Sequence, residues 1–385
     1  MKRELQILLL MGTSHGFGRE LMNGITQYLY EQGHSVEFEL RGHLEPVPDW
    51  VKRWRGDGVI VRHNQQSSFT IWEKAGIPYL KLFCPNHPSD IDVDEDLLAE
   101  LAVQHFLERG IPHFAYFSQC DLYWSNRRRD SFCRAVKRLK KEVSVYERHA
   151  EDTAPYRMWH PRERAEFVAW VRQLPKPVGM LAAFDYHARQ VLELCRQEGI
   201  SVPDDVAVLG VNNDSWFCRI QYPPLSSIIQ NGRKIGQECA RILCDKILGN
   251  PIPKLPLLFP PTGVYTRRST DLIVTQDAEV RKALLQIRTQ ACQGLTIEQL
   301  VEENGYSRRA LERKFRQELG RTLAEEILKV RLESAEELLR ETDMAIGNIV
   351  FAVGLTSHSH FNRLFVKKHG FPPTEYRKRF QSFYD

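Results

Sequence analysis

Short apolar runs alternate with amphipathic segments along the first 270 residues of the chain. The runs include QILLLM, SVEFEL, GVIV, HFAYFS, GMLAAF and VAVLGV. The segments between them have helical periodicity, at 17–31, 94–109, 125–140, 161–173, 186–198 and 232–248. Such an alternation is typical of βαβ units on a parallel sheet. Because this length exceeds the comfortable size of one sheet, we predict two α/β lobes with a cleft between them, flanked by helices.

The pattern changes near residue 280. Prolines crowd the stretch 251–261, and TGVYTRRST (262–270) is suited to one last strand. From 280 onward β-branched runs disappear, and Leu, Glu, Arg and Lys dominate, as is typical of helices. We therefore divide the chain into an α/β domain at 1–270, a linker at 271–279 and an all-α domain at 280–385.

The C-terminal region contains one supersecondary unit twice. Two segments align with each other, glycine with glycine and phenylalanine with phenylalanine. They are TIEQLVEENGYSRRALERKFRQELG (296–320) and AIGNIVFAVGLTSHSHFNRLFVKKHG (345–370). Each unit consists of a short helix, a glycine-centred turn and a second helix. Thr296 with Gln299 predicts a capping box, and Ser307 is placed to cap the helix that follows.

The second helix of each unit presents residues that suit DNA. Leu311 and Phe315 define the buried face of one helix, and Phe361 and Phe365 that of the other, so the intervening positions face outward. Arg, Asn, Glu and Ser are residue types that hydrogen-bond to base edges. The predicted DNA-contacting residues are Arg308, Arg309, Glu312, Arg313, Arg316, His358, Ser359, Asn362, Arg363 and Lys367.

The charge distribution supports this interpretation. Residues 281–385 hold 18 Lys/Arg against 14 Asp/Glu, so the whole net charge of +4 lies at this end. Basic stretches at 307–321 and 358–380 suit phosphates. The helix expected between the two units, at 323–342, would be roughly 30 Å long. That length is close to the roughly 34 Å between successive major-groove faces of DNA, so the sequence predicts two helix-turn-helix motifs on one side of a duplex.

Several other functions find no support in the sequence. No apolar run approaches the roughly 20 residues that cross a bilayer, and we interpret MKRELQILLLMG as a buried first strand rather than an export signal. The eight cysteines form no CxxC pair, so we expect buried, reduced thiols and a cytoplasmic protein. We find no catalytic constellation, no nucleotide loop in GTSHGFGRE and no zinc site in the divergent pair His358 and His360. We therefore predict no enzyme, no metal and no cofactor.

Two known families resemble the two domains. Residues 280–385 resemble the AraC/XylS-type DNA-binding domain, most clearly in GLTSxSHFNRLFxKxxGxxPxxYR (354–377). Residues 5–270 resemble the LacI/periplasmic sugar-binding type of effector domain, in WSNRRRDSF, GMLAAFD, SVPDDVAVLGVNND and TRRST. This combination is similar to that of the bacterial xylose-operon activators.

The resemblance implies a transcriptional activator that binds a sugar in the cleft of its first domain, with D-xylose or a related sugar as effector. It implies a homodimer that binds double-stranded operator DNA and acts with RNA polymerase. The implied sugar contacts are Arg19, Arg128, Asp185 and Asn212, with Phe17, Trp124 or Trp216 as apolar faces. By the same resemblance, activators of this group usually have Asp where this chain has Asn212, and an amide donates hydrogen bonds that a carboxylate cannot.

Alternatives remain open at this stage. A regulator of the same architecture that answers to another sugar, or that represses, fits the sequence equally well. A solute-binding module for transport would explain the first domain, but it predicts an export signal and no basic helical repeat. An enzyme on the α/β fold would need a nucleophile or cofactor motif.

Overall fold

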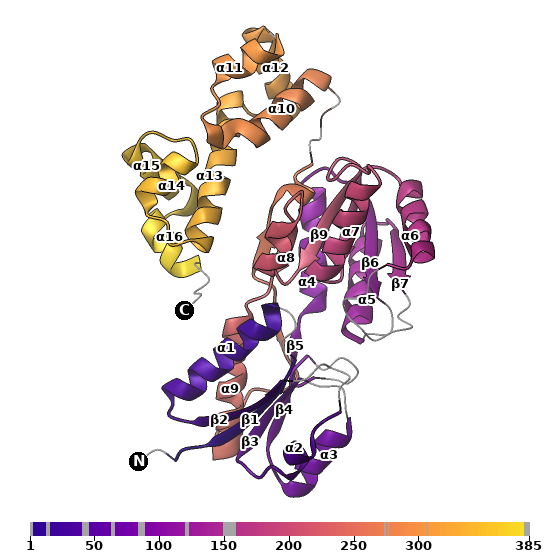
Figure 1. The fold of residues 1–385 in the computed structure, drawn as a ribbon, viewed down its shortest axis with the longest axis vertical. Coiled ribbons are helices and arrows are strands. Elements are labelled where there is room, and N and C mark those ends of the chain that lie inside the picture. Colours follow the sequence, from indigo (N-terminus) through magenta and orange to yellow (C-terminus); the bar gives the residue numbers. More distant parts are fainter. Residues whose placement is uncertain are drawn as a thin grey trace. The chain divides into compact units, whose positions relative to one another are not determined.

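A computed structural model of the chain shows two compact units, Met1–Leu272 and Ile273–Asp385 (Figure 1). The structure describes residues 3–12, 16–40, 46–62, 66–83, 89–119, 123–148, 159–272, 275, 277–305 and 307–380. Unit 1 is an α/β fold, and every element that the structure describes in unit 2 is a helix. The predicted fold class is confirmed for both parts of the chain.

The first lobe of unit 1 is a four-stranded parallel sheet with the strand order β2-β1-β3-β4. Its central strand β1 (Gln6–Met11) alternates its side chains between two cores. Ile7 and Leu9 pack on the side of α1 (Gly16–Glu31) and α9 (Gly232–Leu248), and Leu8 and Leu10 pack on the opposite side. Because both faces are covered, the strand is apolar from Ile7 to Met11. The other elements are β2 (Ser35–Leu40), β3 (Gly58–Arg62), β4 (Tyr79–Lys81), α2 (Asp49–Arg53) and α3 (Gln66–Ala75).

The second lobe is a six-stranded sheet with the order β12-β10-β9-β8-β6-β7. Its strands are parallel except β12, which pairs antiparallel with β10. Phe114 and Leu209 face the core shared with α4 and α5, and Phe117 and Val208 face the core shared with α6 and α7. The bounds are β6 (His113–Gln119), β7 (Val143–Arg148), β8 (Val178–Ala182), β9 (Val206–Val211), β10 (Ser226–Ile229), β12 (Gly263–Tyr265), α4 (Glu95–Leu107), α5 (Tyr123–Arg138), α6 (Pro161–Gln173), α7 (Asp185–Gln197) and α8 (Ser215–Ile220).

The two lobes are interwoven along the chain. The chain passes from one lobe to the other between β4 and α4, returns between β10 and α9, and crosses again between β11 (Leu257–Phe259) and β12. Strand β11 pairs in parallel with the short strand β5 (Ile91–Val93), which belongs to the first crossing. The end of unit 1 therefore belongs to the second lobe.

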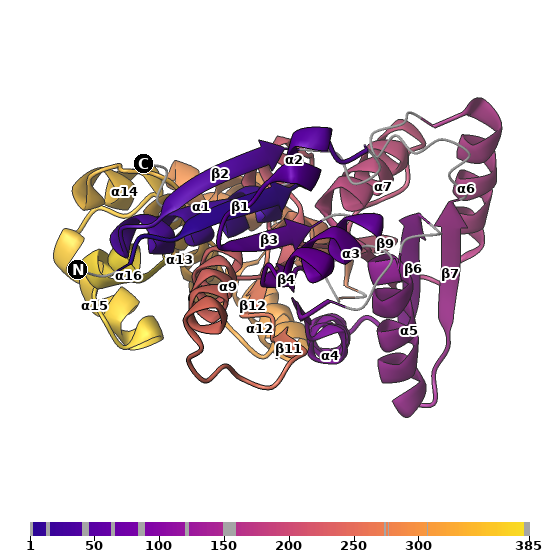
Figure 2. The same ribbon diagram turned by 90° about the horizontal axis from the view of Figure 1, so that it is seen from below.

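Helices α1 and α9 pack closely side by side in the first lobe (Figures 1 and 2). Two glycines make the close approach possible. A Cβ atom on Gly24 would lie 1.9 Å from the Arg233 carbonyl oxygen, and one on Gly236 would lie 2.2 Å from the Leu21 carbonyl oxygen. Neither contact is compatible with any side chain, because the obstructing atoms belong to the backbone of the facing helix.

Unit 2 contains the repeated helix-turn-helix unit that the sequence predicts. Leu300, Leu311 and Phe315 lie in one core, and Ile349, Phe361 and Phe365 lie in a second. Helix α13 (Leu323–Glu341) contributes side chains to both cores. The remaining elements are α10 (Ala278–Gln290), η2 (Ala291–Gln293), α11 (Ile297–Asn304), α12 (Arg308–Leu319), α14 (Ile346–Ala352), α15 (His358–His369) and α16 (Pro373–Phe380).

The predicted helix signals in unit 2 are confirmed with one exception. The capping box of Thr296 and Gln299 forms, and the turn glycines Gly305 and Gly354 have φ of +68° and +75°. The prediction for Ser307 is wrong, because its side chain makes no capping hydrogen bond although it occupies the N-cap position of α12. The equivalent Ser357 does cap α15, through the His360 N–H.

Two further expectations concern the cysteines and the membrane. Among the described cysteines, Cys195, Cys218, Cys239 and Cys244 are buried, and Cys133 and Cys292 are half-buried; all six are free thiols. Cys84 and Cys120 lie outside the described residues. Within the part of the chain that the structure describes, every helix is too short or too polar to span a membrane.

Substitution of Gly24 tests the helix contact. We expect Gly24→Ala to lower the free energy of unfolding of unit 1 by about 1 to 3 kcal/mol, because the helices must move apart to admit the methyl group. Chemical denaturation followed by circular dichroism measures the change. The control is Asn23→Ala at the neighbouring exposed position, which should stay within about 0.5 kcal/mol of the parent. Equal stability of both variants would contradict the packing described.

Candidate ligand site and nucleic-acid interface

Strand β9 ends in a polar tip, Asn212 to Asp214. Asn212 and Asn213 have φ of +99° and +50°, a region that asparagine tolerates better than most residues. The Asn212 N–H donates to the Ile228 carbonyl at 2.9 Å, and the Asn213 N–H donates to Ser227 Oγ at 2.9 Å. Strand β10 therefore holds the tip in a backbone conformation that turns the chain sharply away from the sheet.

Asp214 joins the two lobes of unit 1. It is buried and caps α8, where its Oδ1 accepts from the Trp216 N–H at 3.2 Å. Its Oδ2 accepts from the Gly16 N–H at 2.7 Å and lies 3.6 Å from the Arg19 guanidinium. Gly16 and Arg19 belong to α1 in the other lobe, so a single carboxylate binds the N-terminal turn of that helix.

Asp185 lies directly behind this contact, at the start of α7. Its two oxygens accept from the Asp214 N–H at 2.6 Å and from Ser227 Oγ at 2.5 Å. Burial raises the pKa of Asp185 to about 7, although both hydrogen bonds act in the opposite direction. A Cβ atom on Gly210 would lie 2.2 Å from the Asp185 carboxylate, which explains the glycine within the apolar run VAVLGV.

Glu20 is a second carboxyl group at the same place. It lies beside the first residue of α9, Gly232, whose N–H is a hydrogen-bond partner of its carboxylate. Burial raises the pKa of Glu20 to about 7, and the nearby Asp214 also raises it. Phe17, one turn of α1 away, is buried and lies edge-on to Phe83 with ring centroids 5.1 Å apart. We call Gly16–Glu20, Asp185, Asn212–Asp214 and Gly232 the interlobe junction.

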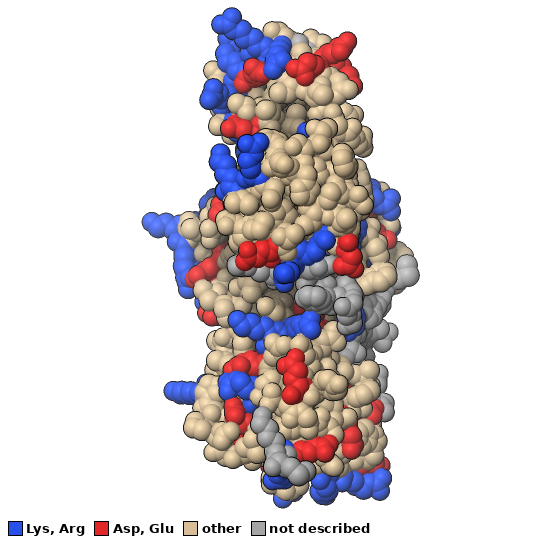
Figure 3. Space-filling view, turned by 90° about the vertical axis from the view of Figure 1, so that its left-hand side faces the viewer, with Lys and Arg blue, Asp and Glu red and all other residues tan. Residues whose placement is uncertain are grey.

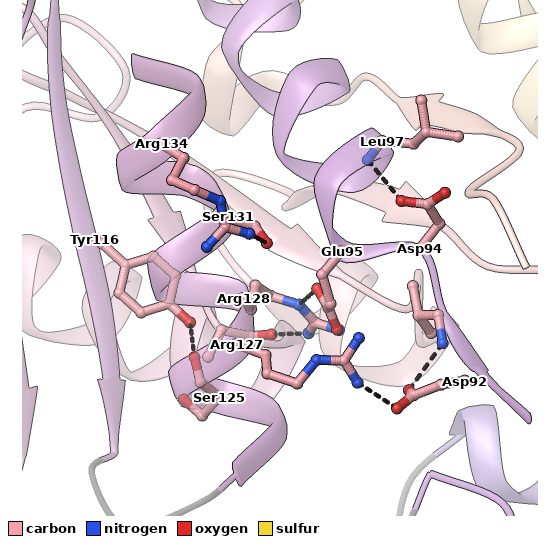
Figure 4. Close-up of polar contacts among 12 residues, drawn as sticks. Asp92, Asp94, Glu95, Leu97, Tyr116, Ser125, Arg127, Arg128, Ser131 and Arg134 are labelled. Atoms are coloured by element: carbon pink, nitrogen blue, oxygen red, sulfur yellow. Dashed lines mark hydrogen bonds and ion pairs between the residues drawn. The ribbon is translucent and has the colours of Figure 1, made fainter. Parts of the chain in front are cut away.

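Arg128 lies in a buried ion pair rather than in an open position (Figure 4). Its Nε and one terminal nitrogen donate to the two Glu95 oxygens, each at 2.8 Å, and the other terminal nitrogen donates to the Ala183 carbonyl. Burial raises the pKa of Glu95, and the positive charge of Arg128 opposes that shift. Its guanidinium also lies 5.4 Å from the ring centre of Trp124. A direct sugar contact by Arg128 stays a prediction, since its guanidinium donates to Glu95 of α4 and to the Ala183 carbonyl, which follows β8.

The structure brings most of the predicted sugar contacts together. Phe17, Arg19, Asp185 and Asn212 belong to the interlobe junction, and Trp124 approaches it through an edge-on contact with Phe184, centroids 5.6 Å apart. Asp185 and Asn212 follow the carboxyl ends of β8 and β9, where ligands bind in open α/β sheets. Trp216, beside Asp214, is 66% exposed. The roles of these residues in binding stay predictions.

Sequence reasoning missed Asp214, Glu20 and Glu95. Asp214 had a usable signal, because an aspartate directly before a short helical segment is a typical N-cap. Glu20 and Glu95 had none, because a glutamate in a helix is more often exposed than buried.

The predicted DNA-contacting residues lie on α12 and α15, the second helix of each repeated unit. Burial along 311–320 repeats position for position along 361–370. The side chains of Glu312 and Asn362 are half-buried. The other predicted DNA-contacting residues are exposed, namely Arg308, Arg309, Arg313, Arg316, His358, Ser359, Arg363 and Lys367.

Ion pairs divide these cations into two groups. Arg308 is paired with Glu298 at 2.8 Å and with Glu312 at 3.1 Å, so a phosphate would have to compete for it. Lys368 is similarly paired with Glu336 at 2.6 Å. Within the described part of the chain, Arg313 and Arg363 have no such partner and hold equivalent positions on the two helices. The uppermost part of Figure 3, formed by α10 to α12, carries Lys and Arg along one edge.

Family models match both units. A periplasmic binding protein-like domain matches residues 103–270, and a helix-turn-helix domain matches residues 300–379. The chain is 29% identical over 386 residues to the xylose operon regulatory protein of Escherichia coli strain K12, which covers 97% of this chain and 96% of the relative. The xylose operon regulatory protein of Haemophilus influenzae is 27% identical, with 97% and 98% covered.

A solved structure described as the xylose-binding transcription activator xylR has the same fold along the whole chain. Its TM-score is 0.69 and its sequence is 27% identical, with 99% of this chain and 100% of that chain covered. Both domains, their order and their lengths therefore agree with those of the relatives. The chain is therefore similar over its whole length to the xylose operon regulatory proteins, and its two domains, a periplasmic binding protein-like domain followed by a helix-turn-helix domain, are those of a DNA-binding transcription regulator.

Proposed function

We propose that this protein is a sugar-responsive transcriptional activator in which a pentose, with D-xylose as the first choice, binds at the interlobe junction and changes the affinity of unit 2 for operator DNA. The observation that carries this proposal is the contact of Asp214 with the N-terminus of α1. A ligand that binds among these groups changes the contacts that hold the two lobes together. The full-length similarity to xylose operon regulatory proteins supports the choice of sugar.

The chemistry of the junction suits a sugar. Asp214 and ionised Asp185 accept hydrogen bonds, Arg19 donates them, and Asn212 does both, so hydroxyl groups find partners of either kind. Phe17 and Trp124 supply aromatic faces for the C–H groups of a pyranose ring. Sites of this type combine an apolar lining with a few polar groups that fix orientation.

Arg267 provides a physical route from the junction to the end of unit 1. Its side chain donates to Asn213 Oδ1 at 2.9 Å and to the Leu225 carbonyl at 2.8 Å, and it lies 3.7 Å from the ring centre of Tyr265. The segment that follows is bonded to β10 through Ser226 and leads out of the unit at Leu272. A displacement of the polar tip is therefore felt by the residues that precede unit 2.

A sugar can change DNA affinity only through a difference in its own affinity for two states of the protein. Such coupling typically amounts to about 1 to 3 kcal/mol. We further propose a homodimer that binds paired half-sites, acts with RNA polymerase and works in the cytoplasm. In this proposal the protein needs no cofactor besides its sugar effector and catalyses no reaction.

A sugar screen tests the proposed effector. We expect D-xylose to raise the melting temperature of the full chain more than L-arabinose or D-ribose, because a ligand that binds the folded state stabilises it by mass action. Gel-shift titration with the same sugars should show tighter DNA binding with D-xylose. A larger rise in melting temperature with another sugar would make that sugar the effector in place of xylose. Equal DNA affinity with every sugar would contradict the proposed coupling between sugar binding and DNA binding.

Unit 2 should bind DNA through Arg313 and Arg363. Arg313→Ala and Arg363→Ala should each weaken binding to selected operator DNA by about 1 to 3 kcal/mol, because an arginine that contacts a base edge is lost. Lys329→Ala, at a partly exposed position of α13, is the matched control. Sugar affinity measured by calorimetry should be unchanged in all three variants, and its loss would contradict the division of labour between the units.

The buried carboxyl groups predict a pH dependence. The pKa of Asp185 is about 7 in the folded chain but near 4 in an unfolded one. The folded chain therefore holds an extra proton between these values, and its contribution to stability falls as pH rises through this window. Replacing Asp185 with Asn removes that fall, so the melting temperature of Asp185→Asn relative to the parent should rise between pH 5 and pH 8.

The melting temperature of the variant must be compared with that of the parent, because the contribution of His105 to stability changes with pH in the opposite direction. Burial lowers the pKa of His105 to about 3, so this side chain favours unfolding as pH falls below about 6.5. Its effect cancels between the parent and the variant. Asp130→Asn, at a half-exposed side chain of the same lobe, serves as the control. A difference between Asp185→Asn and the parent that does not change with pH would refute the assignment.

A further inference from the structure

The two recognition helices of unit 2, α12 and α15, belong to separately packed cores. The distance between them therefore depends on the elements that join the cores. Helix α13 is one such element, and its 19 residues span about 28 Å at 1.5 Å per residue. A single helix leaves the second core free to tilt about its end, so a fixed distance between the recognition helices needs a second contact.

The structure contains that second contact. The segment Ala291–Leu295, which precedes α11, lies against residues of the second core. Arg331 of α13 donates from Nε to the Ala291 carbonyl at 2.9 Å and from a terminal nitrogen to the Leu295 carbonyl at 3.0 Å. Cys292 packs against the second core with Leu328 and Leu338, whereas Ala291 and Leu295 pack in the first.

Gly354, in the turn of the second unit, faces the same segment. A Cβ atom at this position would lie 2.9 Å from the Ala291 carbonyl oxygen and 3.1 Å from that of Cys292. Its φ of +75° also disfavours any other residue. The turn of the second unit therefore touches the segment that introduces the first.

Arg331 suits this position for a physical reason. The Ala291 carbonyl lies at the C-terminal end of α10, where main-chain carbonyls carry partial negative charge, and the Leu295 carbonyl lies in the loop before α11. The planar guanidinium donates to both carbonyls in a fixed orientation, which a lysine could not do. Burial lowers the pKa of Arg331, because the charged guanidinium loses part of its hydration at this position. These two hydrogen bonds join the helix shared by both cores to the segment that leads into α11, which points to a role in holding the cores together.

We propose that Arg331, Gly354 and Ala291–Leu295 form a latch that sets the distance between α12 and α15, so that the protein binds two major-groove subsites of a duplex at one fixed spacing. Arg331 is the positioning residue of this latch and itself contacts no base. The inference rests on DNA binding by both helices and adds the spacing of the subsites to it.

A spacing series tests the latch on the full-length chain. Duplexes selected from a random library by the parent protein are footprinted to locate the two protected segments, and one to four base pairs are inserted between them. Two inserted pairs rotate one segment relative to the other by about 70°. We expect the parent to lose at least about 30-fold in affinity with two inserted pairs.

Arg331→Met keeps the apolar stem and removes both hydrogen bonds. We expect it to bind the selected duplex about 3-fold to 10-fold more weakly, but to lose less than about 5-fold on insertion. Lys329→Met on the same helix is the control and should retain the spacing profile of the parent. Arg331→Lys, which keeps the charge but not the fork, should have an intermediate profile.

The outcomes separate the latch from DNA binding itself. Tolerance of inserted pairs by the parent, or a uniform loss of affinity in Arg331→Met with the parent's spacing profile, would overturn the latch and leave DNA binding intact. Failure of the parent to select any duplex would overturn DNA binding by both helices. If circular dichroism shows that Arg331→Met is unfolded, the spacing profiles of Gly354→Ala and of the parent test the latch instead.

Discussion

A carboxylate buried between two lobes must find hydrogen-bond donors on both, and Asp214 satisfies this requirement. It caps α8 in its own lobe and accepts from the first turn of α1 in the other. Its main-chain N–H in turn holds Asp185, which holds Ser227. Because an unpaired buried carboxylate is very costly, removing any one donor disturbs the whole chain of contacts. For this reason we propose the interlobe junction as the place where a ligand acts.

The same principle organises unit 2 with different chemistry. Two small cores, each centred on a pair of phenylalanine or leucine side chains, are too small to hold a fixed mutual orientation by themselves. The shared helix and the carbonyl groups around Ala291 supply it. In both units the functional geometry therefore depends on a few polar contacts between apolar bodies that would otherwise be free to move.

The parts of the fold that were predictable are those encoded locally. Apolar runs gave the strands, and the repeated spacing of Leu311, Phe315 and the turn glycines identified both helix-turn-helix units, because side-chain periodicity and positive φ are properties of short segments. Asp214 and Gly16 are 198 residues apart, and no local pattern pairs them. Arg331 was equally hidden, since its acceptors are main-chain carbonyls that any residue carries. Ser307 shows the converse, a valid local signal that the surrounding structure leaves unused.

The matching burial of 311–320 and 361–370 separates two demands on the sequence. The inward positions carry the scaffold and are nearly identical in kind, whereas the outward positions differ, with Arg309 and Glu312 on one helix and Ser359 and Asn362 on the other. Substitution at an outward position leaves the scaffold untouched. One half of the binding surface can thus change its specificity during evolution while the other half still binds the old target. Gradual change of a regulatory network then requires no change in the scaffold.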